Sequence, residues 1–246
     1  MKTTTAVILV AGIGSRLRPI TDDRPKALVD LGGETILGRT VRLLASYGVR
    51  KVVLATGYRE DAVRTAMEGA PVVASYCWNS AFDRTQNSVS LALCRDALGP
   101  EAFFKLDGDV VFQRQVLERL DASSADLAVA VDSGRTLDAE AMKVTLTAPA
   151  GAQIGAFGKG IALSRSAGES IGIERISGPL SPILFAALNA AIDAGDTSLY
   201  YEDVYSRLIA ETGLQAEAVA VADLPWTEVD DFSDLERARE LVRGGA

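Results

Sequence analysis

The 246-residue sequence contains no histidine. Every mechanism that needs an imidazole base, a Ser–His–Asp triad or a histidine-ligated zinc is therefore excluded. Cysteine is scarce too, because Cys77 and Cys94 form neither a CxxC motif nor a secreted disulfide framework, and this favours a reducing compartment. With these ligands missing or scarce, carboxylates are expected to hold any metal that is bound, which favours Mg²⁺ or a similar hard cation.

Basic residues and long apolar runs are also in short supply. The 25 lysines and arginines are outnumbered by 33 acidic residues, and the net charge of -8 disfavours general binding to nucleic acid. No apolar stretch approaches the roughly 18 residues of a membrane span, and residues 6–11 are too short a run for a signal peptide. We expect a cytoplasmic protein with no nucleic-acid partner and no membrane insertion; the sequence does not fix its oligomeric state.

What is present is the composition of an ordinary globular protein, with 48% hydrophobic and 24% charged residues. No proline- or serine-rich linker divides the chain, so we expect one domain over residues 1–246. Continuous apolar runs at residues 5–10 and 51–56 predict strands buried on both faces, and a third strand is expected at 72–76. The helical periodicity between these strands predicts a parallel sheet.

Later segments extend this pattern. Strands are expected at residues 102–106, 126–132 and 216–221, and helices at 88–97, 180–192 and 202–212. A last helix is expected to begin at Ser233, with Glu236 completing a capping box. Short β-like stretches between 142 and 176 indicate a small antiparallel part. The predicted fold class is α/β: a Rossmann-like, mixed, mostly parallel sheet flanked by helices.

The most informative segment follows the first strand and reads AGIGSRLRPITDDRPK from residue 11 to residue 26. Gly12 and Gly14 let backbone N–H groups approach phosphate oxygens closely. Arg16, Arg18 and Lys26 add positive charge where open α/β sheets bind ligands. The segment lacks a Walker A motif and the third glycine of a dinucleotide fingerprint, so it points to a polyphosphate with a second anionic group.

Residues 11–28 match the pattern AGxGSRLxPxTxxxPKxL without a gap. This pattern resembles the signature of nucleotidyltransferases, which make activated sugars and phospho-alcohols from a nucleoside triphosphate and a phosphomonoester. The segments LDGDVV (106–111), EAMKV (140–144) and WTEVDD (226–231) resemble the phosphocholine cytidylyltransferase branch, with weaker similarity at 168–173 and 201–203.

The resemblance implies a metal site and two catalytic residues. Matched residue by residue, Asp109 and Asp230 would hold the Mg²⁺ that bridges the phosphates. Arg16 would hold the β- and γ-phosphates, and Lys26 would bridge the α-phosphate and the incoming phosphomonoester. The neighbouring Asp231 has an alternative role as a negative charge at a helix N-terminus.

The resemblance also implies a set of residues around the nucleotide. They are Leu9, Ala11, Gly12, Gly14, Ser15, Gln86, Asn87, Ser88 and Asp107. Other roles remain open for some of them, since Asn87 and Ser88 suit a helix N-cap and Asp107 suits a turn.

The acceptor pocket is expected where aromatic and acidic residues occur together. The candidate acceptor-binding residues are Lys143, Tyr200, Tyr201, Glu202, Trp226 and Glu228. A quaternary ammonium binds to aromatic faces beside a carboxylate, whereas a sugar or polyol would use the same acids for hydrogen bonds. Aromatic side chains of this kind also serve as core, and Lys143 would also suit a solvated strand.

The favoured activity is a Mg²⁺-dependent cytidylyltransferase that joins CTP to a phospho-alcohol, phosphocholine first of all, and releases pyrophosphate. A nucleotidyltransferase that uses UTP, dTTP or CTP with a sugar or polyol phosphate is the alternative enzyme. A catalytically inactive nucleotide-sugar sensor would not need Arg16, Lys26, Asp109 and Asp230, and a Rossmann dehydrogenase would need the missing glycine.

Overall fold

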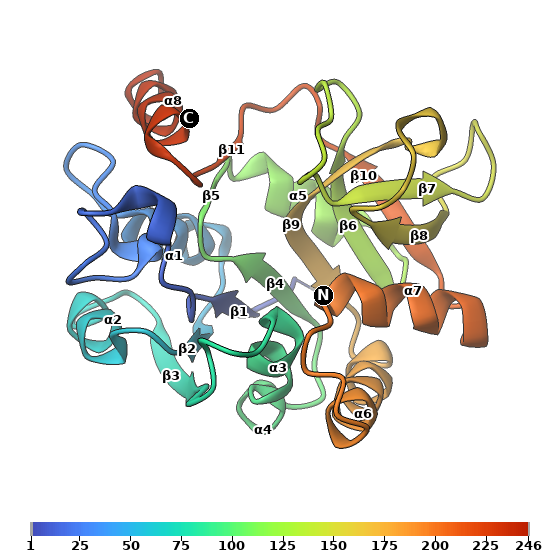
Figure 1. Cartoon of the computed structure of the whole chain (residues 1–246), viewed down its shortest axis with the longest axis horizontal. Coiled ribbons are helices and arrows are strands. Elements are labelled where there is room, and N and C mark those ends of the chain that lie inside the picture. The colour runs from blue at the N-terminus through green and yellow to red at the C-terminus, as the bar shows by residue number, and fades with distance from the viewer. Residues whose placement is uncertain (1, 246) are drawn as a thin grey trace.

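The computed structural model describes residues 2–245, and a nine-stranded mixed sheet runs through its centre (Figure 1). The strands of this sheet are β1 (Thr5–Leu9), β2 (Lys51–Thr56), β3 (Val73–Trp78), β4 (Phe103–Asp107), β6 (Leu127–Asp132), β7 (Lys143–Leu146), β8 (Ile154–Gly158), β9 (Gly168–Ile176) and β10 (Ala216–Ala220). A separate two-stranded sheet pairs β5 (Val110–Val111) with β11 (Thr227–Glu228).

The main path of the large sheet has the order β10-β6-β9-β4-β1-β2-β3. Strands β4, β1, β2 and β3 pair in parallel, as do β10 and β6, whereas β9 is antiparallel to both β4 and β6. Strands β7 and β8 pair antiparallel and join the sheet through β9. The predicted fold class is confirmed, including the antiparallel part between residues 142 and 176.

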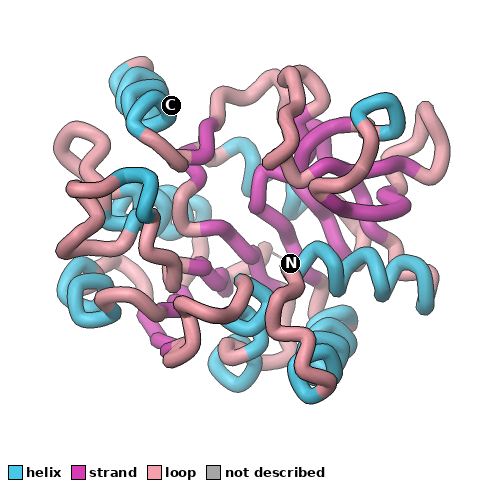
Figure 2. Tube along the Cα trace, in the orientation of Figure 1, coloured by secondary structure: helices cyan, strands magenta, loops and turns pink. Residues whose placement is uncertain are grey.

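Helices cover both faces of the sheet (Figure 2). Ile8 faces the core formed with α1 (Ile36–Tyr47), α2 (Glu60–Ala66) and α5 (Gln115–Ala122). Its neighbour Val7 faces the opposite core, formed with α3 (Asn87–Ala92), α4 (Arg95–Leu98), α6 (Leu180–Asp193) and α7 (Tyr201–Thr212). This alternation of side chains explains why β1 is apolar at every position.

The last helix, α8 (Phe232–Arg243), packs on a smaller core together with the loop that follows β1. This core contains Leu17, Val29 and Leu235, so the loop and α8 are held against each other. Two short 3₁₀ helices, at Ser15–Leu17 and Lys26–Leu28, order the loop. No helix within residues 2–245 combines the length and apolar character needed to cross a lipid bilayer.

Two helix predictions are wrong in detail. The helix expected at 88–97 is divided into α3 and α4, because the N–H of Cys94 bonds to the carbonyl oxygen of Leu91 and tightens the turn there. The capping box of α8 is formed by Asp231 and Asp234 rather than by Ser233 and Glu236. Asp231 begins the helix because its carboxylate accepts hydrogen bonds from the N–H groups of Ser233 and Asp234.

The carboxyl ends of β1 and β4 meet at one edge of the sheet, where Leu9 lies in register with Asp107. The turn after β4 approaches β1 so closely that a Cβ on Gly108 would lie 2.5 Å from the carbonyl oxygen of Leu9. Only glycine permits this approach, which places Asp107 and Asp109 beside the loop that follows β1.

Candidate active site

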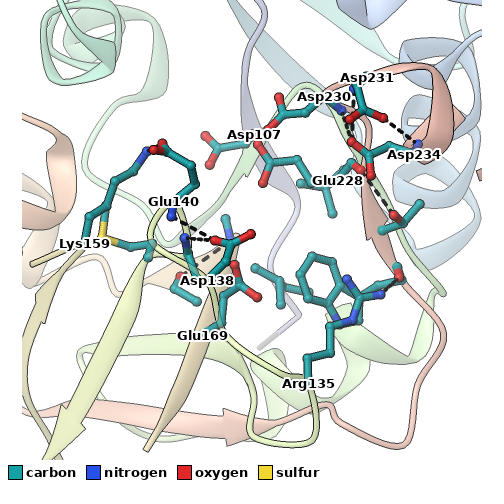
Figure 3. Close-up of a pocket in the computed structure, with 18 of the residues that line it drawn as sticks. Asp107, Arg135, Asp138, Glu140, Lys159, Glu169, Glu228, Asp230, Asp231 and Asp234 are labelled. Carbon is teal, nitrogen blue, oxygen red and sulfur yellow. Dashed lines mark hydrogen bonds and ion pairs between the residues drawn. The ribbon is translucent and has the colours of Figure 1, made fainter. Parts of the chain in front are cut away.

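A cavity of about 530 Å³ opens at this edge of the sheet. Its size is typical of small-ligand sites. Nine acidic and four basic side chains line it, so the cavity carries an excess of negative charge. In Figure 3 the labelled acids other than Asp107 form two groups: Asp138, Glu140 and Glu169 in one, and Glu228, Asp230, Asp231 and Asp234 in the other.

The predicted catalytic and metal-binding residues meet in space. The Nζ atom of Lys26 lies 2.5 Å from Asp109 Oδ2 and 2.7 Å from Asp230 Oδ1, although Lys26 and Asp230 are 204 positions apart in the chain. Arg16 reaches Asp230 Oδ1 at 2.9 Å from the exposed side. The side chain of Lys26 is only 16% exposed, so this residue also neutralises two carboxylates inside the protein.

The charges in this group shift one another's pKa values. Burial alone would lower the pKa of Lys26, but Asp109 and Asp230 outweigh it and raise this pKa above its ordinary value. Burial likewise opposes ionisation of Asp230, and Lys26 and Arg16 overcome it and hold the pKa of Asp230 below its ordinary value. Lys26 and Asp230 are therefore both charged at neutral pH.

Asp109, Asp230 and Glu228 offer carboxylate oxygens that all lie within 4.8 Å of one another. Asp109 Oδ1 is buried and has no hydrogen-bond partner among the described residues, which is what an oxygen reserved for a cation would show. Hard oxygen donors of this kind suit Mg²⁺. Glu228, one of the expected acceptor-binding residues, lies beside the two aspartates of the candidate metal site. Burial, reinforced by the negative charges of Asp109 and Asp230, raises the pKa of Glu228 to about 9.

Beneath the cavity lies a buried charged cluster that the sequence analysis does not single out in full. Lys105, fully buried, places its Nζ 2.9 Å from Asp107 Oδ1 and 3.2 Å from Glu174 Oε2. The Tyr201 hydroxyl donates a hydrogen bond of 2.8 Å to Asp107 Oδ2, and Lys105 Nζ lies 3.4 Å from the centre of the Tyr201 ring. A lysine within the apolar run of β4 and a glutamate within that of β9 are the sequence signals for this cluster.

Glu202 adds a third acid to this cluster and also lines the cavity. Only 4% of the residue is exposed, and its Oε2 atom has no hydrogen-bond partner among the described residues. Burial, which Asp107 reinforces and Lys105 opposes, raises the pKa of Glu202 to about 7. Burial raises the pKa of Glu174 to about 8 in the same way.

The aromatic side chains expected around the acceptor already contact cations of the protein itself. The Arg135 guanidinium lies 4.0 Å from the centre of the Trp226 ring, whose Nε1 donates to Asp132 Oδ2 at 2.7 Å. Tyr201 is fully buried against Lys105. Tyr200 lines the cavity, with Lys159 Nζ 5.1 Å from the centre of its ring.

Lys143 does not face the cavity, which corrects the expectation that its ammonium group reaches the acceptor phosphate. The residue is 2% exposed, and its Nζ donates to the carbonyl oxygens of Lys159 at 2.8 Å and Ala141 at 3.2 Å. Lys143 therefore neither reaches the acceptor phosphate nor lies in solvent, because its ammonium group donates hydrogen bonds to these carbonyl oxygens and ties two loops together.

The residues predicted around the nucleotide lie in two places, and the first is the end of β1 with the loop that follows it. Gly14 has a left-handed backbone (φ 70°), and a Cβ there would lie 2.7 Å from the Cβ of Lys26. A Cβ on Gly12 would meet no protein atom within 4 Å. The carbonyl oxygens of Leu9 and Ala11 accept hydrogen bonds from the N–H groups of Gly108 and Tyr58, each at 3.0 Å. Ser15 is exposed in its 3₁₀ turn.

The second part of this set lies at the start of α3. Asn87 lines the cavity, and its Oδ1 accepts a hydrogen bond of 3.0 Å from the N–H of Tyr201. Ser88 is buried and donates to the carbonyl oxygen of Leu199 at 2.6 Å, so it connects α3 with the segment before α7. Gln86 is exposed and is the N-cap residue of α3.

Residues 6–169 match the model of the MobA-like NTP transferase domain. The chain belongs to this family and is a nucleotidyltransferase by class. Its fold and the convergence of the loop after β1 with Asp109 and Asp230 agree with this assignment.

Curated relatives are similar along nearly all of the chain. The CMP-5'-(3-aminopropyl)phosphonate synthase of Streptomyces rubellomurinus is 34% identical over 246 residues, which cover 95% of this chain and 38% of that protein. The bifunctional IPC transferase and DIPP synthase of Rubrobacter xylanophilus is 30% identical, over 98% of this chain and 52% of that protein. The CTP:phosphoglutamine cytidylyltransferase of Campylobacter jejuni is 26% identical, over 94% of this chain and 97% of that protein. The chain thus spans about half or less of the first two relatives.

Solved structures share the fold. The inositol-1-phosphate CTP transferase of T. maritima matches with a TM-score of 0.83 at 20% identity, over 100% of this chain and 98% of that one. The CTP:phosphocholine cytidylyltransferase of Streptococcus pneumoniae matches with a TM-score of 0.75 at 18% identity, over 98% of this chain and 100% of that one.

Proposed function

We propose that the protein transfers CMP from CTP to a small acceptor that carries a phosphate or phosphonate at one end and an ammonium group at the other. Phosphocholine is the acceptor that the sequence resemblance favours. The observation that carries the proposal is the convergence of Arg16 and Lys26 with Asp109 and Asp230 beside an acidic cavity, which Arg16 and Asp230 line. The relatives named for CMP or CTP chemistry support the choice of nucleotide.

The reaction needs no protein nucleophile and no base. An anionic oxygen of the acceptor forms a bond to the α-phosphorus of CTP, and the bond from that phosphorus to the oxygen bridging the β-phosphate breaks. Pyrophosphate leaves, and no proton has to be removed. The protein's task is to position two anions and stabilise their charge, which Arg16 and Lys26 are placed to do.

Mg²⁺ is the proposed cofactor, with Asp109, Asp230 and Glu228 as its ligands. When bound there, it would neutralise phosphate charge and assist the departure of pyrophosphate. The proposed nucleotide contacts are Gly12, Gly14, Ser15, Gln86, Asn87, Ser88, Asp107 and the backbone of Leu9 and Ala11. Gly12 is the best supported of these. Its backbone φ is not left-handed, and no protein atom lies within 4 Å of the place where a Cβ would be, so the protein itself does not require a glycine there. The close approach of a nucleotide would require one.

A panel of substrates tests the proposal. Pyrophosphate release is measured with CTP, UTP and dTTP against phosphocholine, phosphoethanolamine, inositol 1-phosphate and glucose 1-phosphate. We expect the highest kcat/KM with CTP and one of the two cationic acceptors, because acidic side chains dominate the cavity. If a neutral sugar or polyol phosphate is used best, the protein is a sugar- or polyol-phosphate nucleotidyltransferase instead.

We further propose that the protein works in the cytoplasm. The nucleoside triphosphate substrate is available there, and both Cys77 and Cys94 are free thiols, as a reducing compartment requires.

A further inference from the structure

One buried oxygen of a residue that lines the cavity has no partner. Glu202 is 96% buried, as its 4% exposure implies, yet it lines the cavity, and its Oε2 accepts no hydrogen bond from the described residues. A buried carboxylate oxygen without a donor is costly, and such an atom in a native protein calls for an explanation. A donor from a bound ligand would supply one.

The nearby lysine is already committed to other acids. Lys105 forms ion pairs with Asp107 at 2.9 Å and Glu174 at 3.2 Å. One buried cation therefore faces the buried carboxyl groups of Glu174 and Glu202 and the partly exposed one of Asp107. A second cation at Glu202 would stabilise the ionised form of this carboxyl group, which burial otherwise disfavours.

The aromatic rings are poorly available for a methylated ammonium. Arg135 lies over Trp226, Lys105 over Tyr201 and Lys159 over Tyr200. Trp226 is 4% exposed and Tyr201 is fully buried, so neither presents an open face to the cavity. A quaternary ammonium depends on such faces, whereas a primary ammonium binds through its three N–H donors.

Further acceptors of hydrogen bonds line the same cavity. Glu169 and Asp138 lie close together in Figure 3, away from the group around Asp230. One Asp138 oxygen, Oδ1, accepts from the N–H groups of Glu140 and Ala141, which orders the loop that carries it. The cavity thus combines a buried carboxylate without a donor, a second group of acids and few open aromatic faces.

Resting on the proposed function, we propose that the acceptor is a primary aminoalkyl phosphate or phosphonate whose ammonium group donates a hydrogen bond to Glu202 Oε2. The enzyme then selects for N–H protons on the acceptor nitrogen and discriminates against phosphocholine, which has none. Glu202 is a specificity-determining residue, and the phosphate end of the acceptor lies at Lys26.

The test uses the wild-type protein and an acceptor series that differs only in methylation. Phosphoethanolamine, its N-methyl and N,N-dimethyl derivatives and phosphocholine are compared for CMP transfer from CTP, and their binding is measured by isothermal titration calorimetry. We expect kcat/KM and affinity to fall along the series, by about tenfold or more between its ends. Equal or better use of phosphocholine overturns the inference but leaves the proposed cytidylyl transfer standing.

The binding data keep the two proposals separable. If the order of affinities holds without any transfer, the inference stands and the proposed function fails. If no member of the series is bound or used, the inference is overturned.

A pair of variants on α7 assigns the effect to one side chain. Glu202→Gln should lower kcat/KM for phosphoethanolamine by about tenfold, mainly through KM, and change that for phosphocholine by less than about twofold. Glu211→Gln lies at the exposed far end of the same helix and should leave the ratio between the acceptors unchanged. An equal loss with both acceptors in Glu202→Gln would show that Glu202 does not contact the ammonium group.

Discussion

The ammonium group of Lys26 lies between the carboxylates of Asp109 and Asp230, at distances of 2.5 and 2.7 Å. The same two carboxylates belong to the candidate metal site. Lysine and a divalent cation therefore compete for negative charge at one place. A lysine that balances two acids in the absence of ligand can turn toward phosphate once a metal ion takes over that task.

Replacing this lysine should separate its effect on turnover from its effect on Mg²⁺ binding. In Lys26→Met, turnover should fall about 10²–10³-fold, the typical loss for one group that stabilises transition-state charge. The rise in Tm on adding Mg²⁺ should exceed that of the wild type, because the competing cation is gone. Steady-state pyrophosphate release and thermal unfolding in EDTA and in Mg²⁺ measure both. Near-normal turnover would remove Lys26 from the catalytic residues.

At the scale of single elements, helix α8 shows how adjacent residues take different roles. Asp230 points to Lys26 and Arg16, whereas Asp231 caps the helix and accepts hydrogen bonds from the N–H groups of Ser233 (2.7 Å) and Asp234 (3.0 Å). The cap fixes where α8 begins and thereby where the side chain of Asp230 points. The alternative role expected for Asp231, a charge at a helix N-terminus, is confirmed.

The two aspartates should therefore respond differently to mutation. Asp231→Ala should lower the free energy of unfolding by about 0.5–2 kcal/mol, the usual cost of losing an N-cap, and retain most activity. Asp230→Asn should abolish Mg²⁺-dependent turnover while keeping the helix cap. Urea unfolding and pyrophosphate release at several Mg²⁺ concentrations test this. Loss of activity in Asp231→Ala without loss of stability would give Asp231 a direct role in the site.

Sequence periodicity predicts most elements because apolar runs and helical spacing report burial directly. The strand at residues 51–56 agrees with the structure, and the helical periodicity between the first two strands corresponds to α1. The short helix α5 is missed although its three buried apolar side chains have helical spacing, because eight residues make only about two turns and such a short pattern is easily overlooked. The division of α3 from α4 depends on local hydrogen bonds that periodicity does not detect.

The candidate site, too, is predictable from the sequence only in part. The residues of the loop after β1 are recognisable because their place along the chain implies one edge of the sheet. Asp109 and Asp230 are recognisable through the resemblance to nucleotidyltransferases. The pairing of Lys105 with Glu174 is not, because it arises only when β9 inserts antiparallel beside β4. The carbonyl cage around Lys143 likewise depends on where two loops fold.

At the scale of the whole molecule, β9 joins the two halves of the sheet. It pairs with β4 on one side and with β6 on the other, and β10, from the last third of the chain, extends the β6 side. We propose that residues 1–246 form a single domain that unfolds in one cooperative step. Far-UV and near-UV circular dichroism should report coincident urea transitions, and two separated transitions would contradict the single-domain proposal.

The buried carboxyl groups make stability depend on pH in a direction that can be worked out. Burial raises the pKa of Glu174 to about 8 and that of Glu202 to about 7, from an ordinary value of 4.5. Between about pH 4.5 and about pH 8 these two groups bind more protons in the folded state than in the unfolded chain. The free energy of unfolding therefore decreases as the pH rises from about 4.5 to about 8. With no histidine in the sequence, no imidazole opposes this trend. Urea unfolding at pH 5, 6, 7 and 8 should show the decrease, by at most about 1.4 kcal/mol per pH unit for each proton. Glu174→Gln, which mimics the protonated acid, should flatten it, and a free energy of unfolding that increases over this range would show that these acids are ionised in the folded protein.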